Sequence, residues 1–492
     1  MSMIKVENLT FSYPSSYHNI FENVSFQIDT NWKLGFVGRN GRGKTTFLNL
    51  LLGKHEYSGK IQSSVPFNYF PYPVADSSRL TEDILMEICP FAEEWEFMRE
   101  LSYLDVAADV LWRPFETLSN GEQTKTLLAA LFLNDGQFLL IDEPTNHLDT
   151  NARAIVSAYL QKKTGFILVS HDRHFLDHCV DHILSLNRTN IDVQSGNFSS
   201  WMANFERQQE FEHTQNDRLQ KDIRQLQQAA RRSAVWSDRV EASKVGAADK
   251  GYVGHKAAKM MKRAKSLEAR QQQAIEHKAG LLKNTETTEK LKLSPLRYHS
   301  NTLVSFSDIA VCYDGNAICS PVSFTIHQGE RVVLEGKNGS GKSSLLKLLS
   351  GQPIAHTGTR SIGSGIVISY VPQDTSHLCG TLSDFAAEHH IEECLFKAIL
   401  RKMDFDRIQF EKDISDFSGG QKKKVLIAKS LCERAHLYVW DEPLNFIDIF
   451  SRIQIEQLLK DFSPTMIFVE HDRAFQQAIA TKTIRLTPPA NR

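Results

Sequence analysis

The chain has 492 residues, of which 41% are hydrophobic and 23% are charged, and its formal net charge is −1. This length exceeds what one hydrophobic core usually supports, so we expect two domains and a connector. The sequence has neither a run of about 20 apolar residues for a membrane span nor the apolar core of a secretory signal, which predicts a cytoplasmic protein. Seven cysteines without a C-x-x-C pair suit a reducing compartment and argue against a structural zinc site.

One ordered set of nucleotide-binding motifs occurs twice in the chain. A glycine-rich phosphate loop, G-x-x-x-x-G-K-[ST], occupies residues 38–45 and again residues 336–343. Each copy continues with S-N-G-E or S-G-G-Q, then Asp-Glu-Pro after an apolar run, then His-Asp, and corresponding residues lie 298 to 300 positions apart. A single phosphate loop arises by chance, but four motifs repeated in order at one offset predict a duplicated domain.

Apolar runs and helical patterns recur at matching places in the two copies. Strands are predicted at 33–38, 138–141, 166–169, 331–336, 437–440 and 466–469, and helices at 45–52 and 343–349. Continuous apolar runs of this length are typical of strands buried on both faces of a mostly parallel sheet. We therefore predict an α/β protein with two tandem P-loop nucleotide-binding domains, over residues 1–200 and 301–492.

The connector, residues 201–300, has a different composition. Residues 205–240 and 257–293 are rich in Gln, Lys, Arg, Glu and Ala without proline, which predicts two long helices with a narrow apolar seam. Joined by the glycine-containing loop 243–255, they would form an antiparallel hairpin whose arms, about 35 residues each, reach roughly 50 Å. Residues 218–270 carry fourteen Lys or Arg against five Asp or Glu, so an anionic partner is expected at this segment.

The phosphate loops predict which residues surround a bound nucleotide. Backbone N–H groups of each loop and of the following helix would bind phosphate oxygens, and the loop lysine would contact the β and γ phosphates. The expected nucleotide contacts are Gly38, Asn40, Gly41, Gly43, Lys44, Thr45 and Thr46 in the first copy, and Gly336, Asn338, Gly339, Gly341, Lys342, Ser343 and Ser344 in the second.

The Asp-Glu-Pro motifs predict the metal ligands and the catalytic bases. The expected Mg²⁺ ligands are Thr45 and Asp142 in the first copy, and Ser343 and Asp441 in the second. The next residues, Glu143 and Glu442, are candidates for the base that positions and deprotonates the attacking water. An Asp-Glu pair can also be a solvated turn, but a preceding apolar run and exact duplication of the motif disfavour that interpretation here.

With these motifs the chain resembles the ATP-binding cassette superfamily. Residues 119–122 and 418–421 are similar to its signature motif, and His171 and His471 to its switch histidines. The resemblance implies a monomer whose two cassettes pair head to tail around ATP. One site would combine Lys44, Thr45, Asp142, Glu143 and His171 with Ser418 and Gly420, and the other Lys342, Ser343, Asp441, Glu442 and His471 with Ser119 and Gly121. It also implies that Tyr13 and Tyr313 stack on adenine.

The chain departs from the family pattern at a few positions. Gln373 is the glutamine that the resemblance implies as a nucleotide and Mg²⁺ ligand, but the first copy has Tyr72 at that place. Asn120 replaces the first signature glycine, a tolerable change because Asn accepts left-handed backbone. Leu444 and Phe446 stand where the first copy has threonine and histidine. These differences lead to the hypothesis that the two sites turn over ATP at unequal rates.

A cassette pair with a basic helical arm further resembles the ABC-F proteins, of which the sequence EPTNHLD at residues 143–149 is typical. The resemblance implies binding of a 70S ribosome at its exit site, with the arm directed towards the peptidyl-transferase centre beside a P-site tRNA. Independently, a long cationic arm suits RNA phosphates, although a solvated hairpin without a partner is the alternative. The expected contacts with 23S rRNA or tRNA are Arg231, Arg232, Lys244, Lys256, Lys259, Lys262, Arg263 and Lys265.

Within that group, four segments are similar to the Lsa-type antibiotic-resistance proteins: residues 30–35, 38–43, 111–115 and 440–448. This resemblance implies target protection, in which the ATP-bound protein docks on a drug-stalled ribosome, the loop 243–255 perturbs the drug pocket, and hydrolysis releases the protein. Lincosamides, pleuromutilins and group A streptogramins are the drugs implied. The drug step rests on the resemblance alone.

Other functions remain open from the sequence. A housekeeping ABC-F translation factor acting on P-site tRNA would bind ribosomes without raising drug tolerance. The ATPase subunit of a drug exporter would co-purify with membranes, and a static adaptor would not need both glutamates. A DNA-repair ATPase is a further alternative, because phosphate binding alone does not distinguish DNA from RNA; we expect neither DNA nor a membrane as the partner.

Overall fold

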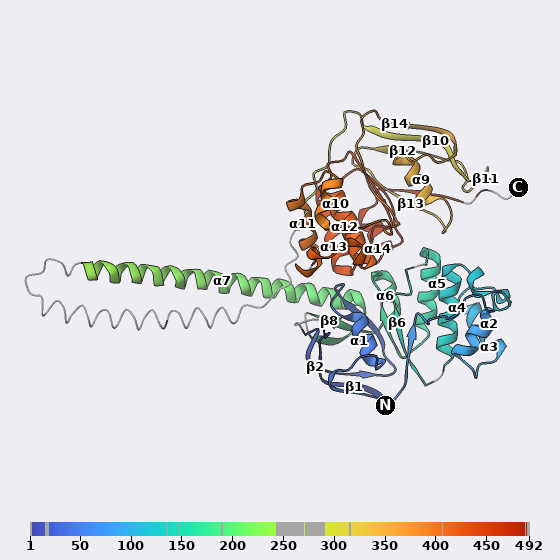
Figure 1. Ribbon diagram of the computed structural model, residues 1–492, viewed down its shortest axis with the longest axis horizontal. Helices are drawn as coiled ribbons and strands as arrows, with labels where there is room; N and C mark the ends of the chain where they lie inside the picture. Colours follow the sequence, from blue (N-terminus) through green and yellow to red (C-terminus); the bar gives the residue numbers. More distant parts are fainter. Residues whose placement is uncertain are drawn as a thin grey trace, which may run out of the picture. The chain divides into compact units, whose positions relative to one another are not determined.

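The computed structural model describes residues 2–14, 19–134, 136–146, 148–187, 190–242, 270, 291–313, 316–405, 407–487 and 489. The chain forms two compact units, residues 1–201 together with 289–492, and residues 202–288. The first unit contains both motif copies, and most of their helices and some of their strands are labelled in Figure 1.

The first copy is built on a six-stranded sheet with the order β5-β6-β7-β3-β8-β9. Neighbouring strands are parallel except for β8 and β9, which are antiparallel. The strands are β3 (Lys33–Gly38), β5 (Phe67–Phe70), β6 (Phe138–Asp142), β7 (Phe166–Val169), β8 (His182–Leu186) and β9 (Ile191–Ser195). The predicted strands at 33–38, 138–141 and 166–169 are thus confirmed as β3, β6 and β7.

A smaller antiparallel sheet packs over the helix that follows the phosphate loop. Its order is β2-β1-β4, with β1 (Met3–Phe11), β2 (Phe21–Asp29) and β4 (Ser58–Ser63). The helix α1 (Lys44–Leu51) lies between the two sheets, because the ring of Phe47 contacts Phe21 and Phe26 of β2 and Phe36 of β3, with centroids 5.5 to 5.9 Å apart. Burial of these aromatic rings fixes α1, and with it the phosphate loop, against the central sheet.

The remaining helices of the first copy lie between β5 and β8 in sequence. They are α2 (Thr81–Ile88), α3 (Glu94–Tyr103), α4 (Asn120–Leu133), α5 (Thr150–Gln161) and α6 (Arg173–Cys179), with short 3₁₀ turns at Ala108–Trp112 and Phe115–Thr117. The signature motif begins α4: the Ser119 hydroxyl accepts from the Glu122 N–H at 3.3 Å, and Glu122 accepts from the Ser119 N–H at 2.9 Å. This reciprocal capping box sets where the helix starts.

The second copy repeats the plan with a five-stranded parallel sheet in the order β15-β16-β17-β13-β18. Its strands are β13 (Arg331–Glu335), β15 (Ile368–Val371), β16 (Leu437–Asp441), β17 (Met466–Val469) and β18 (Lys482–Arg485). The antiparallel sheet contains β10 (Thr302–Tyr313), β11 (Asn316–Ala317), β12 (Val322–His327) and β14 (His356–Ile362). The helices are α9 (Lys342–Leu349), α10 (Leu382–Glu388), α11 (Glu393–Lys402), α12 (Gly419–Cys432), α13 (Ile449–Phe462) and α14 (Arg473–Ile479), with 3₁₀ turns at Arg407–Glu411 and Ile414–Asp416.

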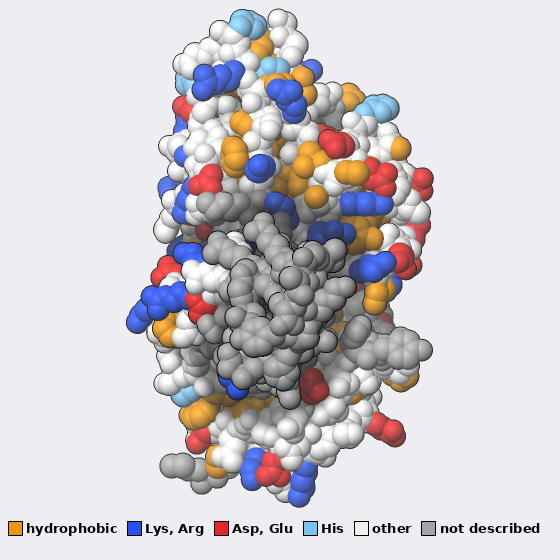
Figure 2. All heavy atoms as spheres, turned by 90° about the vertical axis from the view of Figure 1, so that its left-hand side faces the viewer, with side chains coloured by type: hydrophobic (Ala, Val, Ile, Leu, Met, Phe, Trp, Pro, Cys, Tyr) orange, Lys and Arg blue, Asp and Glu red, His pale blue; other side chains and the backbone are white. Residues whose placement is uncertain are grey.

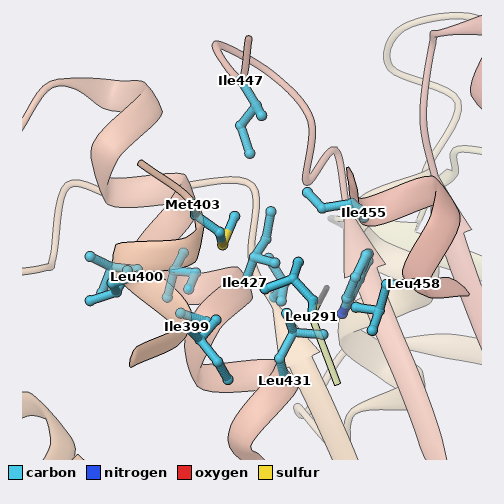
Figure 3. Packing of buried hydrophobic residues seen from close by; sticks show 14 of the residues in the cluster. Leu291, Ile399, Leu400, Met403, Ile427, Leu431, Ile447, Ile455 and Leu458 are labelled. Atoms are coloured by element: carbon cyan, nitrogen blue, oxygen red, sulfur yellow. The ribbon is translucent and has the colours of Figure 1, made fainter. Parts of the chain in front are cut away.

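The core of the second copy extends to residues that the sequence placed in the connector. Leu291 and Leu293 are 4% and 3% exposed and belong to a cluster with side chains of α11, α12 and α13. Figure 3 shows Leu291 among Ile427, Leu431 and Leu458. Residues 291–293 lie outside any helix here, contrary to the helix predicted over 257–293, because these leucines insert into this core instead of extending a helical seam.

The connector begins with α7 (Phe198–Ala242), a helix of 45 residues and hence roughly 70 Å long. It contains the predicted helix at 205–240 but begins earlier, at Phe198. The rings of Phe198 and Trp201, both in this first turn, are buried and contact each other. The loop 243–255 lies outside the described residues, as does the second predicted helix apart from residues 270 and 291–293. In the part of the chain that the structure describes, no helix is long and apolar enough to cross a membrane.

Candidate ATP sites

Each phosphate loop lies between the end of a buried parallel strand and the start of a helix, β3 with α1 and β13 with α9. Gly41 and Gly43 have φ angles of 80° and 105°, and Gly339 and Gly341 have 79° and 85°. Residues with a Cβ rarely adopt such angles, so the loop path requires glycine at these positions. The loops therefore direct the first backbone N–H groups of each helix to a point where an anion can bind.

The loop lysines are buried and folded back on their own loops. Lys44 Nζ donates to the carbonyl oxygens of Gly38 at 2.7 Å and Arg39 at 3.2 Å, and it lies 3.3 Å from Asn40 Oδ1. Lys342 Nζ donates to the carbonyls of residues 336 and 337, both at 2.9 Å. Burial lowers the pKa of both ammonium groups. An anionic phosphate beside them would offset that desolvation.

The residues proposed for Mg²⁺ meet in both copies. Thr45 Oγ1 donates to Asp142 Oδ2, and Ser343 Oγ donates to Asp441 Oδ1, each at 3.1 Å. The other oxygen of Asp441 is buried without a hydrogen-bond partner among the described residues, which fits a cation ligand. No group of three His, Cys, Asp or Glu side chains that could hold a metal occurs in those residues.

A hydroxyl and a single carboxylate suit Mg²⁺, which usually completes its octahedron with water and substrate phosphates. When bound with ATP, the ion would neutralise negative charge that develops on the phosphate groups. Thr45, Ser343, Asp142 and Asp441 would hold it. The amide of Gln373, which the resemblance implied as a further ligand, instead donates from Nε2 to Glu442 Oε2 at 2.8 Å.

Glu442 is held by three side chains. Its Oε2 accepts from Gln373 and from Asn445 Nδ2 at 2.6 Å, and its Oε1 lies 3.5 Å from His471 Nε2. Burial by itself would raise the pKa of this carboxyl, but the hydrogen bond and charge of His471, with the Gln373 amide, lower it to about 2. The backbone of Glu442 has φ 47°, a left-handed conformation that clusters at functional sites in non-glycine residues. Glu442 is thus a positioned carboxylate throughout the physiological pH range.

Glu143 has the same left-handed backbone, with φ 51°, but a different environment. Its Oε1 lies 3.2 Å from His171 Nε2, although the geometry at that oxygen does not qualify as a hydrogen bond. Burial, followed by the charge of Asp142, raises the pKa of Glu143 to about 8. The pKa of His171 is held well below its usual value by burial and then by Lys44. At neutral pH this carboxyl is therefore mostly protonated.

In the first copy, a tyrosine that the sequence did not single out contacts the aspartate expected to bind Mg²⁺. Tyr72, at the position of Gln373, points to Glu87 and donates to it at 3.4 Å on the exposed surface. Tyr69 instead donates to Asp142 Oδ2 at 3.1 Å. Parallel pairing of β5 with β6, with Tyr69 opposite Leu140, brings the phenol to the end of β6 where Asp142 lies.

The signature of the first copy meets the phosphate loop of the second. A cavity of about 910 Å³ is lined by residues 119–122 and 149 from the first copy and by Lys342, Ser343, Gln373, Glu442 and His471 from the second. The residues predicted for the second composite site line this cavity, including Ser119 and Gly121, except for Asp441, which contacts the lining residue Ser343. It is large enough for a nucleotide, since ligand pockets commonly measure about 300–1,000 Å³.

The other composite site is closely packed. Asn40 Nδ2 of the first copy donates to the carbonyl of Phe446 at 2.6 Å, and Arg39 pairs with Asp404 at 3.4 Å. Gly420 lies beside this contact, because a Cβ built on it would stand 3.1 Å from Asn40 Nδ2. Ser418 caps α12 in a capping box with Gln421, as Ser119 caps α4. The phosphate loop of the first copy thus faces the signature of the second.

Comparison with known proteins agrees with this arrangement. The sequence matches the ABC transporter family twice, over residues 21–146 and 319–445. The chain belongs to the ABC transporter family. The two matched segments contain the phosphate loops, signatures and Asp-Glu-Pro motifs described above. The protein is accordingly an ATPase with two tandem ATP-binding cassettes.

Its relatives include proteins whose names describe a role other than transport. The ribosome protection protein VmlR of Bacillus subtilis is 27% identical over 482 residues, covering 94% of this chain and 83% of VmlR. The energy-dependent translational throttle protein EttA of Haemophilus influenzae is 25% identical over 516 residues, covering 94% of this chain and 88% of EttA. An archaeal ribosome recycling factor, aABCE1, solved with ribosomal stalk protein aP1, superposes with a TM-score of 0.60 at 18% identity, covering 97% and 87% of the two chains. That structure supports the tandem cassette fold.

The two tyrosines predicted to stack on adenine lie at the start of the phosphate-loop helices. Tyr13 OH shares a hydrogen bond with Thr46 Oγ1 at 2.9 Å, and Tyr313 OH with Ser344 Oγ at 3.0 Å. Tyr313 is 51% exposed, whereas Tyr13 packs edge-on against Phe11 and His55. Both rings are placed beside the loops, and adenine stacking stays a prediction.

Each histidine that the resemblance implied as a switch is followed by a buried aspartate that accepts a hydrogen bond from an arginine. Asp172 accepts from Arg153 Nη1 at 2.9 Å, and Asp472 accepts from Arg452 Nη1 at 3.0 Å. Both aspartates also cap the next helix, α6 or α14. These pairs fix the segments that carry His171 and His471. Sequence reasoning missed them, although both arginines recur at an offset of 299.

Tyr69→Phe should weaken Mg²⁺ binding at the first site of this ABC protein. The change removes one of two hydroxyl donors to a buried carboxylate, a loss of about 1–2 kcal/mol that corresponds to a several-fold higher Mg²⁺ requirement. Tyr370 occupies the equivalent place in the second cassette, but its buried hydroxyl has no hydrogen-bond partner among the described residues. Tyr370→Phe is therefore the matched control. Mg²⁺ titration of fluorescent ATP-analogue binding should separate the two variants, and equal shifts would contradict the role of Tyr69.

Proposed function

We propose that this protein is an ATP-dependent ribosome-binding protein that confers antibiotic resistance by target protection. It docks at the exit site of the 70S ribosome, contacts 23S rRNA and P-site tRNA through its arm, and causes release of lincosamide, pleuromutilin or streptogramin A drugs. ATP hydrolysis then resets it. The observation that carries the proposal is the similarity to the ribosome protection protein VmlR along 94% of the chain.

The basic residues of the arm support the proposal that its partner is anionic. Arg218, Lys221 and Arg224 of α7 are exposed and spaced by three residues, so they lie close together along one side of the helix. None of these three was among the residues predicted to contact RNA. Of the predicted ones, Arg231 and Arg232 lie in α7 without described side chains, and residues 244, 256, 259, 262, 263 and 265 lie outside the described residues. Figure 2 shows positive and negative side chains intermixed over the described surface it displays.

The composite cavity explains how ATP would control docking. Because residues of both cassettes line it, a bound nucleotide would contact both and favour their closed pairing, and hydrolysis with release of phosphate would remove the contacts of the γ phosphate. The paired glutamates, Glu143 and Glu442, give each site a candidate base. A protein that bound ATP only to hold its shape would not need them, which disfavours the static adaptor.

A second candidate is a translation factor without a role in resistance. EttA, named a translational throttle protein, is 25% identical to this chain, close to the 27% of VmlR. Sequence similarity of this degree supports both functions to a similar extent. Only the response to drug distinguishes them.

The test is ribosome pelleting with the Glu143→Gln, Glu442→Gln double variant and ATP, with and without lincomycin, beside drug-susceptibility testing of cells that express the wild type. Trapping on 70S particles together with raised drug tolerance supports target protection. Trapping without tolerance supports the translation factor. The double variant without ATP is the control, and no trapping in any condition refutes ribosome binding.

A further inference from the structure

The second cassette contains a buried lysine that the ATP-binding motifs do not account for. Lys423 lies one turn inside α12, just after the signature, and only 3% of its surface is exposed. Its Nζ donates to the carbonyl of Pro372 at 3.0 Å and lies 3.4 Å from the carbonyl of Asp441. A lysine is almost never buried without partners, so these carbonyls account for its position.

The two carbonyls belong to the residues immediately before Gln373 and Glu442. Those two side chains are themselves joined, because Gln373 Nε2 donates to Glu442 Oε2 at 2.8 Å. Lys423 thus closes a ring of contacts that contains α12, the segment after β15, and the end of β16. Displacing the ammonium would release both backbone segments that carry the second-site groups.

The helix that carries Lys423 also reaches the first ATP site. Its signature residue Gly420 lies beside the contact between Asn40 of the first cassette and the carbonyl of Phe446. One helix therefore has its first turn at one ATP site and Lys423 at the catalytic glutamate of the other. Because a helix moves as a rigid element, a shift of its first turn is carried to Lys423.

The first cassette lacks this bridge in its described residues. Thr124 of α4 stands at the corresponding position, and its hydroxyl donates to the Asn120 carbonyl within the same helix at 2.9 Å. Tyr72, which replaces the glutamine, points away to Glu87. Among the described residues, therefore, only α12 joins a signature at one ATP site to the segment that carries the glutamate of the other. α4 makes no corresponding contact through Thr124.

We propose that Lys423 is a positioning residue that couples the signature helix closing the first ATP site to Glu442 and Gln373 of the second. This role depends on the ATPase activity and not on the ribosome proposal. It predicts that contact of the α12 signature with the first ATP site changes the rate of ATP hydrolysis at the second site. Contact of the α4 signature with the second site should change hydrolysis at the first site less.

The experiment uses full-length protein with Glu143→Gln, so that single-turnover ATP hydrolysis reports the second site. Lys423→Met, which keeps the length but not the donor, should slow this turnover about tenfold or more, while the Kd for a fluorescent ATP analogue stays within about twofold. Lys423→Gln, which retains an N–H donor, should recover part of the rate. Thr124→Ala, read in the Glu442→Gln background, is the matched control and should leave first-site turnover unchanged.

A double-mutant cycle tests the coupling itself. Ser418→Ala perturbs the signature at the first site and should slow second-site turnover several-fold when Lys423 is present, but add little when Lys423→Met is also present. Thermal melts of each variant identify any that fail to fold, and Lys423→Gln then carries the test. Unchanged turnover in Lys423→Met or Lys423→Gln, a loss confined to ATP affinity, or strictly additive effects with Ser418→Ala would each overturn the proposal.

Discussion

Glu442→Gln should reduce steady-state ATPase activity by roughly 100-fold or more, whereas Glu143→Gln should reduce it by about tenfold or less. The hydrogen bond and charge of His471, followed by the Gln373 amide, outweigh burial and hold the Glu442 carboxylate in its ionised form, with a pKa of about 2. Burial, followed by the charge of Asp142, raises the pKa of Glu143 to about 8, so the protonated form predominates at pH 7. A general base must be ionised to accept a proton, so we expect the second site to turn over faster.

The same pKa difference gives the two variants opposite pH profiles. In Glu442→Gln the remaining turnover depends on Glu143, so it should rise as pH increases from 7 to 9 and the raised pKa is passed. In Glu143→Gln the turnover depends on Glu442, whose lowered pKa lies far below this range, so the rate should stay nearly constant. Steady-state assays in a constant-ionic-strength buffer series measure both. Equal losses, or parallel profiles, would contradict the assignment of unequal sites.

The sequence predicted the parts of the fold and site that depend on local pattern. Strands such as β6 follow from continuous apolar runs, and the phosphate loops follow from glycines that the backbone conformation requires. The unequal environment of the two sites was also expected in part, from Tyr72, Leu444 and Phe446. The structure gives the physical reason: the Gln373 amide donates to Glu442, whereas Tyr72 at the corresponding position donates to Glu87, away from Glu143.

What the sequence could not predict depends on which strands and helices meet. Tyr69 reaches Asp142 only because β5 pairs in parallel with β6, and neither residue's own pattern specifies that register. Lys423 resembles any lysine in a charged helix until the ends of β15 and β16 are placed against it. The start of α7 and the insertion of Leu291 likewise depend on partners distant in sequence.

Gly420→Ala should disable the first ATP site, while Gly419→Ala should be tolerated. A Cβ on Gly420 would lie 2.4 Å from the carbonyl oxygen of Phe446, a backbone atom that cannot move aside cheaply. That carbonyl accepts the hydrogen bond from Asn40, at 2.6 Å, which joins the two cassettes. Alanine would therefore displace the segment around Phe446 and separate it from the phosphate loop of the first cassette. Overpacking of this kind costs about 1–3 kcal/mol, and loss of the closed site should lower first-site turnover more than tenfold.

Gly419 provides a control on the same turn of α12. A Cβ there would lie 3.6 Å from the Phe446 ring, an ordinary contact, and alanine is favoured over glycine in a helix by up to about 1 kcal/mol. Gly419→Ala should keep wild-type turnover and melt at the same temperature or slightly higher. Single-turnover hydrolysis in the Glu442→Gln background, which reports the first site, distinguishes the two variants. A similar loss of first-site turnover in both variants would mean that the signature excludes side chains for a reason other than the Phe446 carbonyl. Closure of the first site through Asn40 and Phe446 would then be contradicted.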